Sequence, residues 1–250
     1  MTYCVGLLLN EGMVLLSDTR TNAGLDNIST YRKMFTFEDP GERVIVIMTA
    51  GSLSVTQTTI AQLREAIEDP EASPDTSIML APTLLKVAEI VGAALAKVRA
   101  AVDEKLSAMQ GASASMIVAG QRKDGTMRLF LIYPEGNFIE ATEDTPFLQI
   151  GEHKYGKPIL DRAVKFATAI PDGVKLALIS MDSTLRSNLT VGLPIDLMVF
   201  RRDARQAEIN LRIGEDDPYF RMIRERWSAA LRDAHRAIAR PDWMPEVPRG

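Results

Sequence analysis

The chain opens with Met1-Thr2-Tyr3-Cys4-Val5-Gly6-Leu7-Leu8-Leu9, a threonine followed by a short apolar run. The apolar run ends at the turn signal Asn10-Glu11-Gly12, which predicts a buried strand paired in a hairpin with 13–19. Removal of Met1 would leave Thr2 with a free α-amine. A hydroxyl that carries its own amine as general base is a sufficient hydrolytic nucleophile. The start of the chain is therefore a candidate active site.

The composition favours an ordinary globular protein. Hydrophobic residues make up 46% and charged residues 25% of 250 residues, enough for one large domain or two small ones. A net charge of -4 provides no basic face, so we expect no nucleic-acid partner. No segment reaches the roughly 18 apolar residues of a membrane span, and no secretory signal opens the chain. We therefore expect a cytoplasmic protein without a membrane partner.

Cysteine and histidine are too few for a metal or disulfide framework. The single cysteine, Cys4, cannot form an internal disulfide and fits a reducing compartment. Cys4, His153 and His235 do not have the spacing of zinc ligands. We expect no metal and no cofactor, and we interpret Cys4 as a core strand residue.

The remaining elements are expected in the order strands, two helices, strands, two helices, strands, helix. Strands are predicted over 34–37, 43–50, 114–121, 127–133, near 138, and over 147–150, 195–200 and 208–212; helices over about 52–67, 82–106, 157–168, 174–185 and 217–239. The polar stretch 20–31 is expected to be a loop or short irregular strands. Hairpin connections predict mostly antiparallel sheets, and paired helices suit two stacked sheets covered on both outer faces.

The expected organisation is one main domain followed by a helix and tail. No boundary is visible before about Asp217, so residues 1–216 are expected to form the domain. Residues 217–250 would add an amphipathic helix, with an apolar stripe from Phe220 to Ile238, and a Pro-rich tail. We expect this segment to pack on the domain or on a neighbouring subunit.

Several separated motifs resemble proteasome β-type subunits. They are Thr2 opening a strand, Ser17-Asp18-Thr19-Arg20 ending the next, Lys33 beyond a loop, and Thr49-Ala50-Gly51 ending a strand. The opening nine residues, the stretch 17–37 and Gln149-Ile150-Gly151-Glu152-His153-Lys154-Tyr155-Gly156-Lys157-Pro158 are similar to the bacterial ancestral β-subunit branch (Anbu). The resemblance implies the N-terminal-nucleophile hydrolase fold, an α+β four-layer αββα sandwich.

The resemblance implies a catalytic set built around Thr2. Asp18 and Lys33 would be the electrostatic partners of this nucleophile, and the backbone N–H of Gly51 would donate to the oxyanion. The chemistry is sound because an α-amine titrates near pH ~8 and a neighbouring lysine lowers its pKa. A glycine also lets a backbone N–H approach the developing charge closely.

The resemblance implies further residues at the site. Asp182 and Ser187 would lie near the terminal amine, with a spacing similar to the peptidase subunit of the bacterial ATP-dependent ring protease. Contacts to substrate would come from four positions: Arg20, Thr21, Thr49 and Glu152. Glu152 departs from the family pattern, which has Gly-Ser-Gly where this chain has Gly151-Glu152-His153. Its carboxylate could pair with Lys33 or the amine, or face away.

Three functions remain open at this point. The first is a threonine peptidase, active after loss of Met1, that cleaves peptide or related amide bonds in a homo-oligomer, either a ring or an open helical assembly. The second is an assembly or peptide-binding scaffold with little turnover. The third is an N-terminal-nucleophile amidase for a small amide. Subunit contacts would come from the helix over 82–106 and from the last helix.

Overall fold

Two five-stranded antiparallel sheets form the centre of the computed structural model, which describes residues 1–22, 28–105 and 113–244. The first sheet has the order β10 (Phe147–Gly151), β1 (Tyr3–Leu9), β2 (Gly12–Asp18), β11 (Ile195–Arg201) and β12 (Ile209–Ile213). The second has the order β5 (Met34–Asp39), β6 (Arg43–Gly51), β7 (Ala114–Arg122), β8 (Arg128–Ile132) and β9 (Phe138–Glu140). The expected antiparallel sheets are confirmed.

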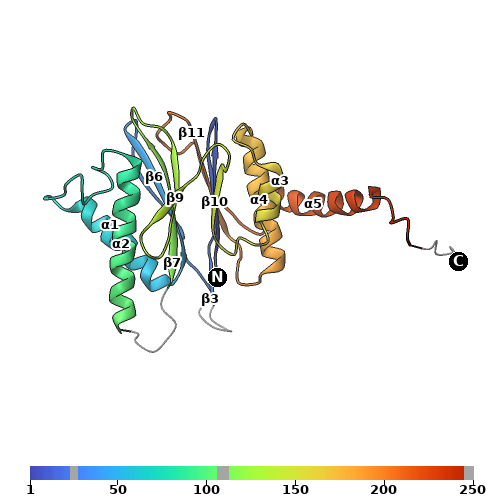
Figure 1. Cartoon of the computed structure of the whole chain (residues 1–250), viewed down its shortest axis with the longest axis horizontal. Coiled ribbons are helices and arrows are strands. Elements are labelled where there is room, and N and C mark those ends of the chain that lie inside the picture. Colours follow the sequence, from blue (N-terminus) through green and yellow to red (C-terminus); the bar gives the residue numbers. More distant parts are fainter. Residues whose placement is uncertain (23–27, 106–112, 245–250) are drawn as a thin grey trace.

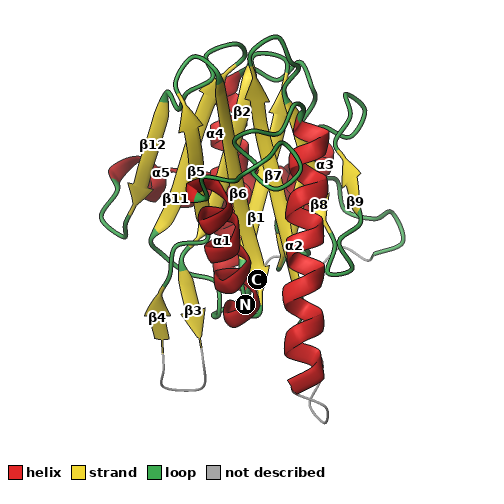
Figure 2. Cartoon of the chain, turned by 90° about the vertical axis from the view of Figure 1, so that its left-hand side faces the viewer, coloured by secondary structure: helices red, strands yellow, loops and turns green. Residues whose placement is uncertain are grey.

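Helices cover both outer faces of the stacked sheets (Figures 1 and 2). The helices α1 (Leu53–Glu68) and α2 (Leu84–Lys105) pack on the second sheet, and α3 (Lys157–Ala163) and α4 (Ile170–Ser187) pack on the first. Three buried apolar clusters fill the three interfaces between layers. One lies between the second sheet and the helices α1 and α2, one between the two sheets, and one between the first sheet and the helices α3 and α4. The α+β four-layer αββα sandwich is confirmed.

The strand β1 is buried on both faces because it lies between the second sheet and α4. Tyr3, Val5 and Leu7 join the cluster on the helix side, whereas Cys4 and Leu8 join the cluster between the sheets. A Cβ on Gly6 would lie 2.9 Å from Leu129 Cδ1, so glycine allows the two sheets to approach here. This sandwiching explains the unbroken apolar run of the opening sequence.

Some boundaries differ from the predicted ones. The helix α3 ends at Ala163, before the expected 168, and α4 begins at Ile170, before the expected 174, with a proline in its first turn. The stretch 20–31 contains the short strands β3 (Arg20–Asn22) and β4 (Ile28–Thr30), one of the two expected forms. The predicted helix end at 106 lies outside the described residues.

The last helix, α5 (Pro218–Ala237), packs on α4 only through its first half and then projects away from the body (Figure 1). Asp217 caps it by accepting a hydrogen bond from Phe220 N at 2.7 Å. Phe220 and Ile223 are buried, but Leu231 is 52% and Ile238 73% exposed. Within the described residues, the apolar stripe is thus buried against this chain only over its first part. The division at 216/217 stays a prediction.

Two absences concern the described ranges only. Across residues 1–22, 28–105 and 113–244, no helix has the length and apolar character of a membrane span. Within the same ranges, the acidic, histidine and cysteine side chains form no group of three that could hold a metal ion.

Candidate active site

Four chain segments bring four of the six predicted catalytic residues together. Thr2 immediately precedes β1, Asp18 ends β2, Lys33 immediately precedes β5, and Gly51 ends β6. The β1–β2 register pairs Cys4 with Ser17, so the next residues outward, Tyr3 and Asp18, also face each other. Tyr3 N donates to Asp18 Oδ1 at 3.1 Å. The hairpin itself therefore places the carboxylate beside the start of the chain.

Asp18 and Lys33 form a buried ion pair. Lys33 Nζ lies 2.7 Å from Asp18 Oδ1, and the two side chains are 6% and 0% exposed. The same ammonium donates to Arg20 O at 2.6 Å and to Met1 O at 3.4 Å. Burial raises the pKa of the Asp18 carboxyl, while Lys33 and two backbone N–H donors act in the opposite direction. The pair holds the lysine in one position next to Thr2.

The second carboxylate oxygen of Asp18 has a partner that the sequence analysis missed. Gly192 N donates to Asp18 Oδ2 at 3.3 Å, from the loop between α4 and β11. The guanidinium of Arg20 packs directly over Gly192 and donates to Leu189 O at 3.1 Å. Arg20 was predicted to contact substrate, but its side chain is directed to this loop. In the sequence, Gly192 next to Leu193-Pro194 is a turn signal that could have indicated this loop.

Thr2 opens into a small cavity, called here the Thr2 cavity, of about 260 Å³. Its lining contains Met1, Thr2, Thr21, Lys33, Thr49, Ala50, Gly51, Leu53 and Thr56. Two of the four predicted substrate contacts, Thr21 and Thr49, belong to this lining, as do Thr2, Lys33 and Gly51. The cavity can hold one side chain of a peptide beside the threonine.

Gly51 occupies a position that only glycine fits. Its φ is +105°, and a Cβ there would collide with Ser113 O. Ser52 N donates to Ser113 O at 2.9 Å, and hydrogen-bonded pairs alternate along an antiparallel ladder. Gly51 N–H therefore points away from β7, and it has no hydrogen-bond acceptor within the described part of the chain. A free N–H at the Thr2 cavity is what an oxyanion requires.

Glu152 contacts Thr2 through its backbone. Glu152 N donates to Thr2 O at 2.7 Å, and Gly151, at φ +81°, leaves no room for a Cβ against Thr2 O. Among the described residues, the carboxylate partner of Lys33 is Asp18, so the predicted alternative of a Glu152–Lys33 pair is not formed. Glu152 therefore holds the main chain of Thr2 through its own backbone N–H.

Asp182 and Ser187 are not brought to the Thr2 cavity. Asp182 is buried on α4, where its two oxygens accept from Arg186 Nε at 3.0 Å and Arg224 Nε at 2.8 Å. Ser187 is exposed at the last residue of α4. The helical period directs Asp182 toward α5, where it fixes the α4–α5 contact. The predicted placement of both residues beside the terminal amine is corrected.

Tyr3 anchors the start of β1 and was not singled out from the sequence. Its phenol oxygen lies 2.6 Å from Ser180 Oγ of α4 and accepts from Gln149 Nε2 of β10 at 2.5 Å. Complete burial raises the pKa of this phenol and of the Cys4 thiol, which is consistent with Cys4 as an unreactive core residue. These contacts hold Thr2 on a rigid strand.

The sandwich fold, with a threonine before β1 and a buried aspartate–lysine pair behind it, defines the class of N-terminal-nucleophile hydrolase folds. Residues 2–199 match the proteasome subunit family. The chain belongs to this family, and its similarity to solved Anbu structures confirms the predicted ancestral β-subunit branch.

Three solved structures illustrate the similarity. An Anbu (Gly-1) mutant from Hyphomicrobium sp. strain MC1 is 45% identical, with 97% of this chain and 100% of that chain covered and a TM-score of 0.91. Anbu from Yersinia bercovieri is 42% identical, with 97% and 100% covered and a TM-score of 0.89. A helical assembly of the Anbu complex from Pseudomonas aeruginosa is 45% identical, with 96% and 98% covered and a TM-score of 0.90. A comparison with curated proteins found no significant match.

Proposed function

We propose that this chain is a threonine peptidase whose nucleophile is Thr2 after removal of Met1. One observation carries the proposal: Thr2, Lys33 of the buried Asp18–Lys33 pair, and Gly51, whose N–H has no acceptor among the described residues, line one cavity. A nucleophile, a charge that tunes its base and an oxyanion donor are the three parts that acyl transfer needs.

Removal of Met1 would create the general base at the right place. Met1 is 60% exposed, whereas Thr2 is 7% exposed, so processing would act on an accessible residue. Lys33 Nζ lies 3.4 Å from Met1 O, which places it within about 6 Å of Thr2 N by covalent geometry. A cation at that distance favours the neutral form of the freed amine and lowers its pKa.

The reaction would run in two acyl-transfer steps. Thr2 Oγ attacks the scissile carbonyl carbon while the Thr2 amine accepts the hydroxyl proton, and Gly51 N–H donates to the resulting oxyanion. Collapse breaks the C–N bond, and the proton passes to the leaving amine. Water, deprotonated by the same amine, then hydrolyses the Thr2 ester and regenerates the hydroxyl. Asp18 keeps Lys33 in place throughout.

A peptide or related amide is the substrate class that this site favours. The Thr2 cavity has room for one side chain, and Thr21 and Thr49 belong to its lining. A small amide remains the second candidate, because the same chemistry serves any acyl group that the cavity admits. The buried ion pair would stabilise a scaffold as well, so the position of the Gly51 N–H beside Thr2 is the feature that favours an enzyme.

We also propose a homo-oligomer in the cytoplasm. The Pseudomonas aeruginosa relative is described as a helical assembly, and the exposed apolar residues Leu231 and Ile238 of α5 suit contact with another copy. The helix α2 would be the second contact. Contacts through these surfaces are compatible with both a ring and an open helical assembly.

The proposal is tested by an electrophile that traps both the hydroxyl and the amine of an N-terminal threonine. We expect a label on Thr2 that disappears in Thr2→Ala and falls strongly in Lys33→Ala. The absence of label on fully processed protein would refute the peptidase and favour the scaffold.

A further inference from the structure

The strand β10 is an edge strand whose outer side is unpaired. Among the described strands it pairs only with β1, at the end of the first sheet. Glu152 N donates to Thr2 O, and Leu8 N donates to Pro146 O, so the even-numbered residues of β10 bond to β1. The N–H and C=O of Phe147 and Gln149 therefore point to the free edge.

These edge groups have no hydrogen-bond partner in the described part of the chain. Gly151 O accepts from His153 N at 2.9 Å, which leaves Gly151 N–H as a further free donor on the same edge. Exposed edges are templates for another strand, and proteins usually block them with bulges, prolines or charges. Here, within the described residues, the edge groups of Phe147 and Gln149 and the N–H of Gly151 are unpaired, and only the carbonyl of Gly151 is occupied.

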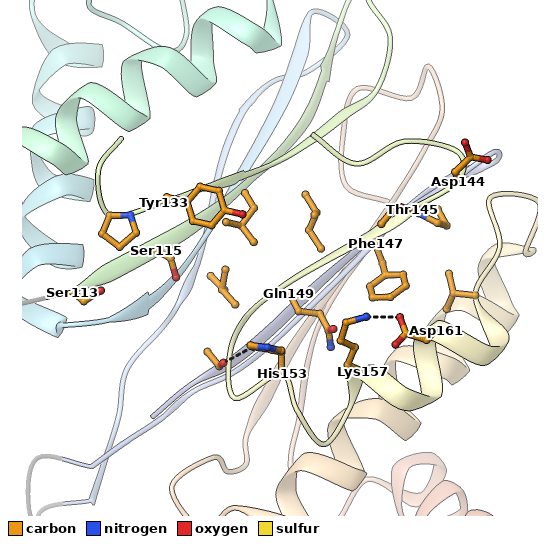
Figure 3. A pocket seen from close by; sticks show the side chains of 17 residues that line it. Ser113, Ser115, Tyr133, Asp144, Thr145, Phe147, Gln149, His153, Lys157 and Asp161 are labelled. Carbon is orange, nitrogen blue, oxygen red and sulfur yellow. Dashed lines mark hydrogen bonds and ion pairs between the residues drawn. The ribbon is translucent and has the colours of Figure 1, made fainter. Parts of the chain in front are cut away.

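A groove of about 740 Å³, called here the edge groove, runs along this strand. Ser115 of β7 and Tyr133, which follows β8, form one wall (Figure 3). Leu131 of β8 also belongs to the lining. The α3 residues Lys157 and Asp161 lie on the other side, joined by an ion pair. The free edge of β10 lies between two walls that could receive alternate side chains of an added strand.

The edge groove adjoins the candidate active site. Gly151, in its lining, faces Tyr3 in the β10–β1 register and packs against Thr2 O. Ser115, also in its lining, faces Ala50 of the Thr2 cavity in the β6–β7 register. The two hollows thus lie next to each other beside Thr2, so a chain bound across Thr2 has room to extend from one into the other.

We propose that the edge groove binds the part of a peptide substrate that follows the scissile bond, as an added strand on β10. The inference rests on the proposed peptidase function, with the residue before the scissile bond in the Thr2 cavity. From Gly151 back to Phe147 the edge spans about 13 Å, which suits roughly four peptide residues. Main-chain hydrogen bonds would provide affinity for many sequences, and the walls would provide preference among side chains.

The first test measures hydrolysis against peptide length. Internally quenched peptides with one constant half before the scissile bond would carry one to five alanines after it. We expect kcat/KM to rise by roughly tenfold up to about four residues and then to level off, since each hydrogen bond adds a modest gain. N-methylation of alternate amides in the longest peptide should remove most of the rise, and this arm needs no protein variant.

The second test uses a matched pair of variants at one position. Gln149→Pro removes the free edge N–H and the side chain, whereas Gln149→Ala removes only the side chain. Proline is tolerated where a strand N–H faces outward. We expect the length-dependent gain to be several-fold smaller in Gln149→Pro than in Gln149→Ala. Equal gains in the two variants, with N-methyl peptides cleaved as well as unmodified ones, would overturn the proposal.

Binding to Thr2→Ala protein separates this inference from the peptidase proposal. A fluorescein-labelled peptide with four residues after the scissile position should bind Thr2→Ala protein measurably, and several-fold more weakly when Gln149→Pro is added. Binding without any Thr2-dependent hydrolysis would refute the peptidase alone. Thr2-dependent hydrolysis whose kcat/KM does not rise with peptide length would refute only the proposal that the edge groove binds substrate. The same result is expected if a second copy of the chain occupies the edge of β10.

Discussion

Replacing Lys33 by methionine removes the cation and keeps most of the side-chain volume. The change leaves Asp18 fully buried, with only Tyr3 N at 3.1 Å and Gly192 N at 3.3 Å as donors. Removing one partner of a buried ion pair costs about 3–5 kcal/mol, because a charge is left uncompensated. The two remaining donors reduce that cost, so we expect a loss near the lower limit, about 3 kcal/mol at pH 7.5.

The direction in which pH changes the stability of Lys33→Met follows from the pKa of the Asp18 carboxyl. Burial raises the pKa of Asp18 above the ordinary carboxyl value, and loss of Lys33 raises it further. The folded variant then holds its proton at pH values where the unfolded chain has released it. Its stability is therefore greatest at low pH and falls as pH rises through that window. We expect the gap between wild type and Lys33→Met to narrow clearly at pH 5.

Urea denaturation at one protein concentration, at pH 5 and at pH 7.5, provides the measurement. Asp18→Asn combined with Lys33→Met should recover most of the lost stability, because the amide oxygen can still accept from Tyr3 N without a charge. The same double variant should have no peptidase activity. Lys165→Met, at an exposed lysine, is the matched control. A Lys33→Met protein as stable as wild type at both pH values, or an active double variant, would refute the reasoning.

Three further changes probe other parts of the site. Gly51→Ala should lower kcat by about 10²–10³, because a side chain at φ +105° displaces the N–H that faces the oxyanion; an unchanged kcat would exclude Gly51 as donor. Burial raises the pKa values of Cys4 and Tyr3, so at high pH each group keeps its proton in the folded protein after losing it in the unfolded chain. Above pH ~8.5 the free energy of unfolding should therefore fall by about 1.4 kcal/mol per pH unit for each such group, first for Cys4 and then for Tyr3. Cys4→Ala should remove the first part of this slope in denaturation curves, and an unchanged slope would contradict the assignment. Arg224→Ala should lower the free energy of unfolding by about 1–2 kcal/mol, a value already discounted for the partial exposure of the guanidinium. Labelling of Thr2 should not change, because Asp182 stabilises the contact between α4 and α5. A large loss of label would instead return Asp182 to the catalytic set.

Local patterns were sufficient for the layers, because the alternation of hairpins and paired helices predicted two stacked antiparallel sheets covered by helices. The β1–β2 hairpin explains why Thr2 meets Asp18. Gly51 lies in the other sheet, and its place beside Thr2 was implied by the resemblance to proteasome β-type subunits. Spacing along α4 did not predict the direction of Asp182. A rotation of about 100° per residue decides which neighbour a helical side chain meets. One of the two partners of that carboxylate, Arg224, lies on α5 and meets it only in three dimensions.

Long-range contacts account for the rest. Gly192 is 174 residues from Asp18 in sequence, and its N–H reaches the carboxylate only because β11 pairs with β2. The free edge of β10 is likewise a property of sheet order, which no local pattern records. The apolar stripe of α5 was read correctly as amphipathic, but its second half has no partner within the described residues of this chain.

The requirement that Thr2 carry a free amine can be measured directly. Intact mass of the protein, recorded on fractions whose hydrolysis of a quenched peptide is measured in parallel, gives activity as a function of the fraction that begins at Thr2. We expect activity to be proportional to that fraction and to vanish in Thr2→Ala. A population that wholly retains Met1 and is still fully active would contradict the mechanism, because the Thr2 nitrogen would then be an amide with no proton-accepting lone pair.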